Sequence, residues 1–145
     1  MDDDRALLAR AVALAGRCPP SGSAFSVGAL VVGPDGTVLA EGWSRRHDPV
    51  EHAEESALAE LGGRVPPGST VYSSLEPCGR RRSRPRTCAQ LILDAGVARV
   101  VFAWREPPVF VEVDGAARLR AGGVEVVEIP ELAAAARAPN AHLVG

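Results

Sequence analysis

Apolar residues recur with helical spacing in the first segment of the chain. Leucine, valine and alanine side chains between residues 4 and 16 fall three or four positions apart, acidic residues precede them, and Gly16 follows. This pattern predicts an N-terminal helix over 4–16. Alanine, glutamate and leucine dominate 51–61, and Gly62 and Gly63 come next, so a second helix is expected there.

Runs rich in β-branched residues predict strands. Two such runs, 26–32 and 37–43, flank a Gly-Pro-Asp-Gly turn sequence and predict a hairpin. Strands and helices then alternate: strands are expected over 69–74, 99–104 and 124–129, and helices over 88–95, 114–121 and 131–137. Alternation of this kind implies right-handed crossovers and a partly parallel sheet. We therefore expect one domain over residues 1–145, of the α/β class, with three α/β/α layers and a mixed sheet of about five strands.

Composition narrows the function classes. Hydrophobic residues make up 46% and charged residues 23%, as in ordinary globular proteins, and the net charge of −2 does not favour nucleic acid or an anionic membrane. No apolar run approaches the roughly 20 residues of a membrane helix. The acidic start is unlike a secretory signal, so a cytoplasmic location is expected. Three cysteines in such a protein favour metal binding or catalysis over disulfides.

Three short stretches carry residue types that bind metals or move protons: His52-Ala-Glu54, Glu76-Pro-Cys78 and Cys88. A catalytic zinc site uses three nitrogen or sulfur ligands and keeps a fourth position for water. His52, Cys78 and Cys88 meet that count, so we expect them to bind Zn²⁺. Positions two apart on a regular helix point in different directions. Glu54 is therefore expected to act as general acid and base rather than as a ligand.

Each of these parts is common by chance, but their order along the chain is that of zinc deaminases. The stretch 25–128 resembles the cytidine deaminase-like superfamily, in its deoxycytidylate and cytosine deaminase branch. The blocks that carry the resemblance are Ser26-Val-Gly-Ala29, His52-Ala-Glu-Glu55 and Ser74-Leu-Glu-Pro-Cys78. The resemblance implies the same zinc ligands and the same proton shuttle. It also implies a cytidine deaminase-like fold.

The resemblance further implies where a substrate would lie. The backbone of Ser74, Leu75 and Glu76 is expected near the leaving amine. Val27, Gly28 and Ala29 are expected, with Ser26, to form the pocket wall opposite the helix that carries His52.

Nine residues separate Cys78 from Cys88, where nucleoside, base and tRNA deaminases usually have only a few. This long loop resembles the pyrimidine deaminases of riboflavin biosynthesis, which act on a diaminopyrimidinone bearing a ribosylamino or ribitylamino phosphate. Residues 24–29, 42–46 and 106–111 are most similar to the stand-alone or fungal-type members. The resemblance thus implies an aminopyrimidine substrate and a homodimer or homotetramer.

The loop between the two cysteines is rich in arginine: Arg80, Arg81, Arg82, Arg84 and Arg86. Guanidinium groups suit bidentate contacts with a phosphate monoester. A solvated basic loop explains them equally well, because all 16 basic residues of the chain are arginine. The loop has no aromatic residue to stack bases, so nucleic acid is not the expected partner.

Some aromatic, histidine and cysteine residues have more than one interpretation. Phe25 or Trp43 either forms a wall of the heterocycle pocket or packs in the core. His47 either contacts substrate or lies on the surface ahead of the second helix. Cys18 is expected to be a free thiol, and His142 is expected to have no catalytic role.

Two other functions stay open at this point. The same chemistry would serve a deaminase of a cytosine-, cytidine- or guanine-type base, nucleoside or nucleotide in salvage or specialised metabolism. A zinc-stabilised binding domain without catalysis is the second alternative. Glu54 argues against that alternative, because a purely structural site needs a fourth protein ligand.

Overall fold

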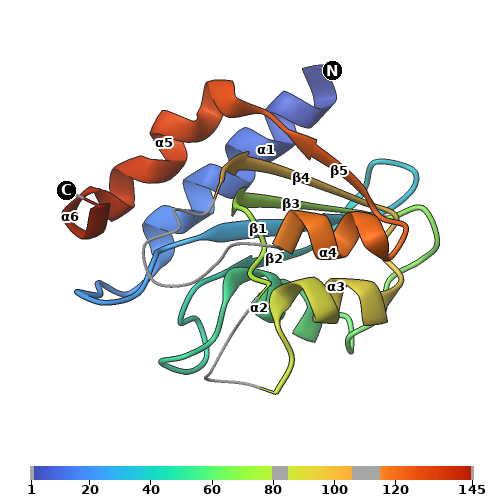
Figure 1. Cartoon of the computed structure of the whole chain (residues 1–145), viewed down its shortest axis with the longest axis horizontal. Coiled ribbons are helices and arrows are strands. Elements are labelled where there is room, and N and C mark those ends of the chain that lie inside the picture. The colour runs from blue at the N-terminus through green and yellow to red at the C-terminus, as the bar shows by residue number, and fades with distance from the viewer. Residues whose placement is uncertain (1, 80–84, 106–114, 145) are drawn as a thin grey trace.

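Five strands form one mixed sheet in the computed structural model, which describes residues 2–79, 85–105 and 115–144. The strand order is β2-β1-β3-β4-β5 (Figure 1). Strand β1 pairs antiparallel with β2 and β3, whereas the β3–β4 and β4–β5 pairs are parallel. The predicted hairpin and the predicted mixed sheet are confirmed. The strands are β1 (Gly28–Val32), β2 (Val38–Trp43), β3 (Thr70–Leu75), β4 (Arg99–Trp104) and β5 (Glu125–Glu128).

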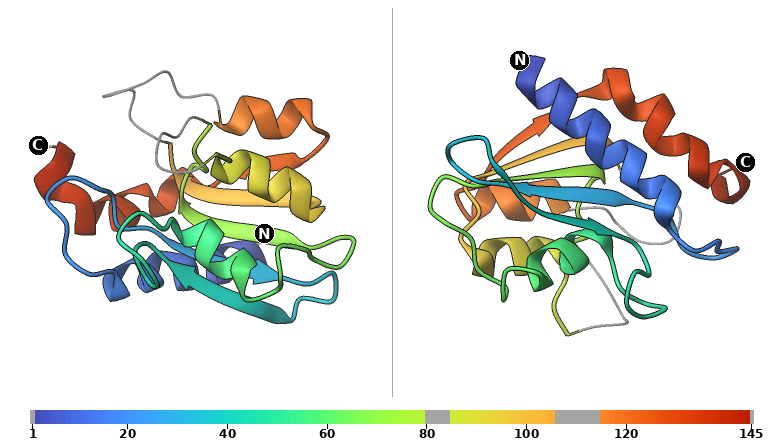
Figure 2. Two further views of the ribbon diagram at one scale, coloured as in Figure 1. Left: turned by 90° about the horizontal axis from the view of Figure 1, so that it is seen from below. Right: turned by 180° about the vertical axis from the view of Figure 1, so that it is seen from behind.

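Helices cover both faces of this sheet, so the three-layer prediction is confirmed (Figures 1 and 2). One face carries α1 (Asp2–Leu14) and α5 (Ala133–Arg137), and the other carries α2 (Ala53–Ala59), α3 (Cys88–Ala95) and α4 (Gly115–Ala121). Short helical segments complete the described chain: η1 (Ala15–Arg17), η2 (Pro130–Leu132), η3 (Ala138–Asn140) and α6 (Ala141–Val144). None of the described helices has the length and apolarity that crossing a bilayer requires.

The second helix begins later than the sequence pattern predicts. A helix was expected from residue 51, but His52 has extended backbone (φ −92°, ψ 160°) and α2 starts at the next residue. The reason is a tight turn in front of it: the Glu51 carboxylate accepts a hydrogen bond from the backbone N–H of His47 (2.8 Å), and the Glu51 N–H donates to the Asp48 carbonyl (3.3 Å). His52 is therefore the N-cap residue of α2.

The C-terminal helical region is longer than predicted. One or two turns were expected over 131–137, whereas helical segments follow one another from Pro130 to Val144. Pro139 does not end this run, because it lies in the first turn of η3, where a missing N–H costs little.

Alternate residues of the central strands supply two apolar cores. Val71 and Val100 belong to the core beneath α2, α3 and α4, together with Ile92. Their neighbours Tyr72 and Val101 belong to the core beneath α1 and α5. Because the side chains of a strand point alternately to its two faces, both faces of the sheet are buried.

Two glycines allow helices to approach the sheet closely on opposite faces. A Cβ atom on Gly28 in β1 would overlap the carbonyl oxygen of Ala11 in α1, and one on Gly42 in β2 would overlap the carbonyl oxygen of Ala53 in α2. Only glycine allows such an approach. The helix that His52 caps is thereby held against β2 at backbone distance.

A buried carboxylate connects α1 to the sheet. Asp4 accepts a hydrogen bond from the Tyr72 hydroxyl in β3 (2.6 Å), and the Arg99 guanidinium in β4 contacts both of its oxygens (3.1 and 2.6 Å). The hydrogen bonds from Arg99 keep the pKa of Asp4 below its ordinary value, against the opposing effect of burial. One residue of the first helix is thus joined to two central strands.

Asp4→Asn should lower the free energy of unfolding by about 1–3 kcal/mol at pH 7, because a charged acceptor of one buried and two partly buried hydrogen bonds is lost. A carboxyl whose folded pKa is depressed contributes stability above its unfolded pKa, and this contribution disappears as pH falls through the folded value. The difference between the two proteins, measured by urea unfolding, should therefore shrink below about pH 4. The exposed neighbour Asp3 supplies the control: Asp3→Asn should change stability by less than about 0.5 kcal/mol. A constant difference from pH 7 to pH 2 would contradict the role given to the Asp4 charge.

Candidate metal centre and active site

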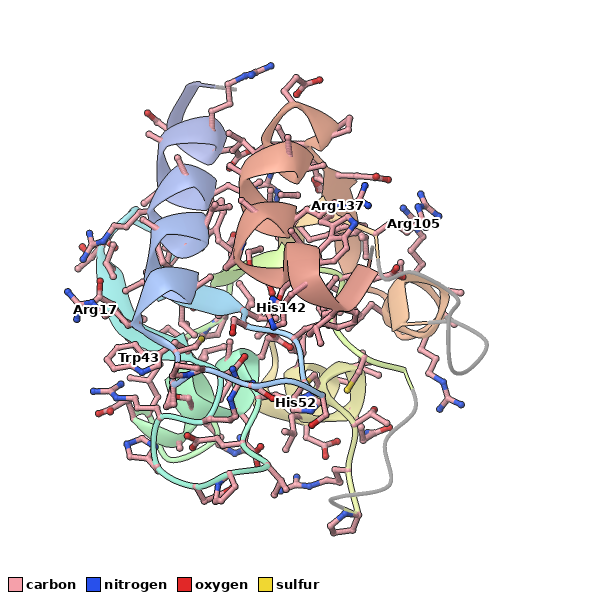
Figure 3. All side chains as sticks on the ribbon, turned by 90° about the vertical axis from the view of Figure 1, so that its left-hand side faces the viewer. Arg17, Trp43, His52, Arg105, Arg137 and His142 are labelled. Carbon is pink, nitrogen blue, oxygen red and sulfur yellow. The ribbon has the colours of Figure 1, made fainter. Side chains whose placement is uncertain are left out.

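The structure brings His52, Cys78 and Cys88 together at one point. Their ligand atoms all lie within 4.8 Å of one another. His52 Nδ1 is 3.2 Å from Cys88 Sγ and 3.6 Å from Cys78 Sγ, so this ring nitrogen faces the two sulfurs. Figure 3 shows His52 where α2 and α3 meet.

The N-terminal end of α3 holds both cysteines. Cys88 is the first residue of that helix and is fully buried. Its backbone N–H donates to Cys78 Sγ (3.2 Å), and the next N–H, of Ala89, donates to the Cys78 carbonyl (3.1 Å). The Thr87 hydroxyl caps the helix by accepting from the N–H of Gln90 (3.1 Å). The helix start therefore fixes the distance between the sulfurs although nine residues separate them in sequence.

A capping interaction likewise fixes His52. The Glu55 carboxylate reaches back and accepts a hydrogen bond from the His52 N–H (3.1 Å). This is the reciprocal half of a capping box, and it orients the residue that precedes the helix.

The two thiols interact strongly with each other. Their mutual hydrogen bond lowers the pKa of Cys78, with help from His52, and raises the pKa of Cys88, where burial and the Glu54 charge act in the same direction. A cation at this point would replace the shared proton, since metal ligation requires thiolates. Two sulfurs and one imidazole nitrogen are a zinc donor set that leaves a fourth position open. The residues present thus fit a catalytic zinc ion.

Glu54 lies beside this group without belonging to it. Its side chain is 4% exposed, and Oε1 accepts a hydrogen bond from the Ser73 hydroxyl (2.9 Å). Burial raises the pKa of Glu54 above its ordinary value. Because His52 precedes the helix instead of lying in it, the expected angular separation on a helix does not apply, and His52 and Glu54 line the same cavity.

A cavity of about 760 Å³ opens over His52, Glu54 and Cys78. Four residues predicted to contact substrate line it as well: Phe25, Val27, Leu75 and Glu76. Phe25 packs edge-on against Trp104, with ring centroids 5.4 Å apart. Glu76 accepts a hydrogen bond from the N–H of Ala116 at the start of α4 (3.0 Å). The cavity is large enough for a small-molecule ligand.

Comparison with known proteins identifies the family. Residues 1–104 match the family described as the cytidine and deoxycytidylate deaminase zinc-binding region. The chain belongs to this family. The resemblance inferred from the sequence blocks is therefore confirmed, and so is the cytidine deaminase-like fold.

Members of the family that act in riboflavin biosynthesis are among the most similar proteins. The chain is 35% identical over 116 residues to the diaminohydroxyphosphoribosylamino-pyrimidine deaminase of Schizosaccharomyces pombe, covering 77% of this chain and 28% of that protein. It is 39% identical over 101 residues to the riboflavin biosynthesis protein RibD of Escherichia coli, covering 70% and 26%. The structure of Acinetobacter baumannii RibD superposes with a TM-score of 0.82 at 29% identity, covering 97% of this chain and 38% of that one. The chain thus spans 26–28% of these two curated relatives.

Three other residues that the family resemblance places near substrate do not line the cavity. Gly28, Ala29 and Ser74 are buried and are not among the residues that line the cavity. The N–H of Gly28 donates to the Ser74 hydroxyl (3.1 Å), which ties β1 to β3.

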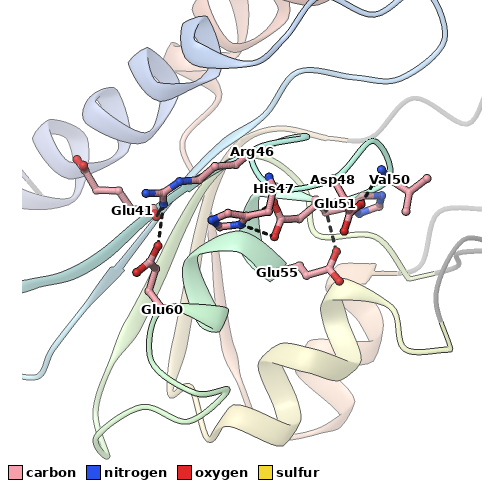
Figure 4. A network of polar contacts seen from close by, with 9 residues as sticks. Glu41, Arg46, His47, Asp48, Val50, Glu51, Glu55 and Glu60 are labelled. Carbon is pink, nitrogen blue, oxygen red and sulfur yellow. Dashed lines mark hydrogen bonds and ion pairs between the residues drawn. The ribbon is translucent and has the colours of Figure 1, made fainter.

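Two of the residues with open interpretations are not among those that line the cavity. His47 is not among the cavity residues; its Nδ1 contacts the Glu51 carboxylate at 2.9 Å, as Figure 4 shows. Trp43 contacts two arginines: the guanidinium carbons of Arg17 and Arg46 lie 5.3 and 4.3 Å from its ring centroid.

The arginines of the inter-cysteine loop are described only in part. Arg86 pairs with Asp94 on the outer side of α3 (3.0 Å). Arg80, Arg81, Arg82 and Arg84 lie outside the described residues.

Sequence patterns missed a wall of the cavity that comes from the C-terminus. His142 and Leu143 line the cavity, and His142 Nε2 contacts the Ser21 carbonyl (2.7 Å). Figure 3 shows His142 and His52 on either side of the loop that precedes β1. No spacing rule connects a C-terminal tail with this loop, so the sequence offered no signal for the contact.

Two side chains hold this loop at Ser26, next to the cavity residue Val27. Asn140 accepts from the Ser26 N–H (2.6 Å) and donates to its carbonyl (3.0 Å). Arg45 donates to the Ser26 hydroxyl (2.8 Å) and to the Phe25 carbonyl (2.9 Å). The backbone of Arg45 has a positive φ of 58°, which is unusual for a residue with a side chain. The loop is thus fixed from both sides.

Asn140→Ala should lower the free energy of unfolding by about 1–3 kcal/mol, because the buried N–H and carbonyl of Ser26 lose their partners. Gln90 is a matched control, since it is the other carboxamide side chain of the chain and lies exposed on α3. Gln90→Ala should change stability by less than about 0.5 kcal/mol. Equal denaturation midpoints for Asn140→Ala and the unsubstituted protein would show that the Asn140–Ser26 pair does not hold the loop.

Proposed function

We propose that this protein is a zinc-dependent hydrolytic deaminase of an aminopyrimidine. Its proposed substrate is the diaminopyrimidinone of riboflavin biosynthesis that carries a ribosylamino or ribitylamino phosphate. In the reaction, water adds to the ring carbon that bears the amino group, the bond from that carbon to nitrogen breaks, and ammonia leaves. The ring keeps the oxygen of the water as a carbonyl.

One observation carries the proposal: a three-ligand metal group and a buried carboxylate that is not a ligand meet at one cavity. His52, Cys78 and Cys88 have their ligand atoms within 4.8 Å of one another, and Glu54 lines the same cavity. When bound, zinc supplies Lewis acidity that lowers the pKa of a coordinated water to about 7. A site with a purely structural ion has no use for Glu54.

Glu54 would move the protons. Its carboxylate accepts one proton from the attacking water and later gives one to the departing nitrogen, which is general acid–base catalysis. Burial, which raises the pKa of Glu54, suits this role, because a shuttle must both accept and release a proton near neutral pH. The hydrogen bond from Ser73 holds one of its oxygens in place.

The cavity residues would bind the ring. Phe25 and Val27 provide apolar surface on one side, and Leu75 and Glu76 lie at the end of β3, next to Cys78. The backbone at Leu75 and Glu76 would contact the leaving amine. The apolar wall would exclude bulk water, which strengthens the polar interactions inside the site.

The choice of substrate is supported by the similar proteins. The S. pombe relative is named a diaminohydroxyphosphoribosylamino-pyrimidine deaminase, and the E. coli and A. baumannii proteins are named RibD. The arginines between residues 80 and 86 would contact the phosphate. We also propose, from the family resemblance, that the protein forms a homodimer or homotetramer.

Ammonia release by the zinc-loaded protein tests this function. We expect the highest kcat/KM with the phosphorylated diaminopyrimidinone and lower values with its dephosphorylated form, cytidine and deoxycytidylate. Equal turnover of the dephosphorylated compound would contradict the proposal that the arginine loop binds the phosphate. A preference for cytidine or deoxycytidylate would support the salvage alternative instead.

Glu54→Gln separates catalysis from metal binding within the same experiment. This variant should keep about one zinc per chain, on the three-ligand assignment, and lose turnover by about a hundredfold to ten-thousandfold. Glu60→Gln is the matched control, because Glu60 is an exposed carboxylate at the other end of α2. Full activity of Glu54→Gln would refute the proton transfer, and loss of zinc would make Glu54 a ligand.

A further inference from the structure

Ser73 contacts the proposed proton shuttle from the middle of the sheet. Its hydroxyl oxygen is 2.9 Å from Glu54 Oε1 and 2.7 Å from the carbonyl oxygen of Leu75. The residue is fully buried, and its backbone lies opposite Ala29 of β1 on one side and Phe102 of β4 on the other. The hydroxyl therefore belongs to the central strand of the sheet, which is paired on both sides.

A hydroxyl at this position needs a reason. Val71, two residues earlier on the same face of β3, is apolar and belongs to the core beneath α2. A buried hydroxyl lowers stability unless it is hydrogen-bonded. Two acceptors lie within hydrogen-bond distance of the Ser73 hydroxyl, which has one hydrogen to donate, so this hydroxyl is hydrogen-bonded. The Leu75 carbonyl alone would satisfy the hydroxyl, so its contact with Glu54 is not required for the fold.

The contact restricts how the Glu54 side chain can turn. The terminal side-chain torsion of glutamate has a broad distribution, so a carboxylate without a hydrogen-bond partner can rotate among many orientations. A hydrogen bond to Oε1 from a rigid strand fixes the carboxylate plane. Proton transfer depends on such placement, because displacing a catalytic group by about 1 Å can lower the reaction rate strongly.

We propose that Ser73 is a positioning residue for deamination: its hydroxyl anchors Oε1 of Glu54 and fixes the orientation of the carboxylate over the metal group. The inference rests on the proposed function and deepens it, since it assigns a role in the same site. Ser73 itself is not among the residues that line the cavity, so it acts through Glu54 and not on substrate.

Ser73→Ala tests the proposal through the kinetic constants of the zinc-loaded protein. We expect kcat to fall by about 10- to 100-fold, as for the loss of a hydrogen bond to a charged group, with KM within about twofold and zinc content unchanged. Ser73→Thr keeps the hydroxyl and should restore kcat to within about threefold of the unsubstituted protein. A purely structural role would lower the melting temperature and leave kcat unchanged.

Ser56 provides a matched control on α2. It is also fully buried, and within the described part of the chain its hydroxyl has no hydrogen-bond partner. Ser56→Ala should leave kcat and KM unchanged. A fall in kcat as large as that of Ser73→Ala would overturn the specific role of Ser73.

A double variant tests the proposal even if threonine does not fit at position 73. If Ser73 acts through Glu54, adding Ser73→Ala to Glu54→Gln should change the remaining rate by less than about twofold. Unchanged kcat in Ser73→Ala, loss of its zinc, or an undiminished effect in the double variant would each overturn the inference while the deaminase function stands. Absence of turnover in the unsubstituted protein with every pyrimidine would overturn the proposed function and this inference with it.

Discussion

Two sulfurs and one imidazole nitrogen are held together within 4.8 Å by the starts of two short helices, and the candidate site depends on this convergence. Neither helix could hold the group alone. The N-terminal end of α3 positions both cysteines through backbone N–H groups, and the N-cap of α2 supplies His52. Gly42 allows α2 to pack closely against β2 at Ala53, the residue after His52. Displacement of either helix would separate the ligands.

The same convergence explains the electrostatics of the site. The Cys88 thiol and the Glu54 carboxylate are buried, and the partly exposed Cys78 thiol lies beside Cys88. Burial is the main cause that raises the pKa of Glu54, and the hydrogen bond between the two thiols raises the pKa of Cys88 and lowers that of Cys78. A divalent ion would favour the deprotonated form of both cysteines, because it binds them as thiolates. Glu54 would then be left as the one group of the cluster that is suited to exchanging protons.

The sequence predicted those features that depend on local chemistry. Metal ligands come from few residue types, so His52, Cys78 and Cys88 could be proposed together, and Gly96 marked the end of α3 because its backbone adopts a positive φ of 84°. Other features depend on distant contacts. Asn140 is hydrogen-bonded to Ser26, 114 residues away in the sequence, and no pattern in the alanine-rich tail predicts that pair. Ser73 is a polar residue on a buried strand, and the sequence does not say which acid it contacts. The geometry of His52 and Glu54 differed from expectation because Glu51 is used in a turn with His47 instead of starting the helix.

X-ray absorption spectroscopy of the zinc-loaded protein tests most directly whether the three residues bind one zinc ion together. We expect one zinc ion bound by two sulfurs at about 2.3 Å and two nitrogen or oxygen atoms at about 2.0–2.1 Å, one from His52 and one from solvent. Cys18→Ser should leave this spectrum unchanged, because Cys18 Sγ faces the Val27 carbonyl (3.4 Å) and is not part of the metal group. A zinc ion with four sulfur ligands, or with none, would contradict the assignment of His52, Cys78 and Cys88 as the metal centre.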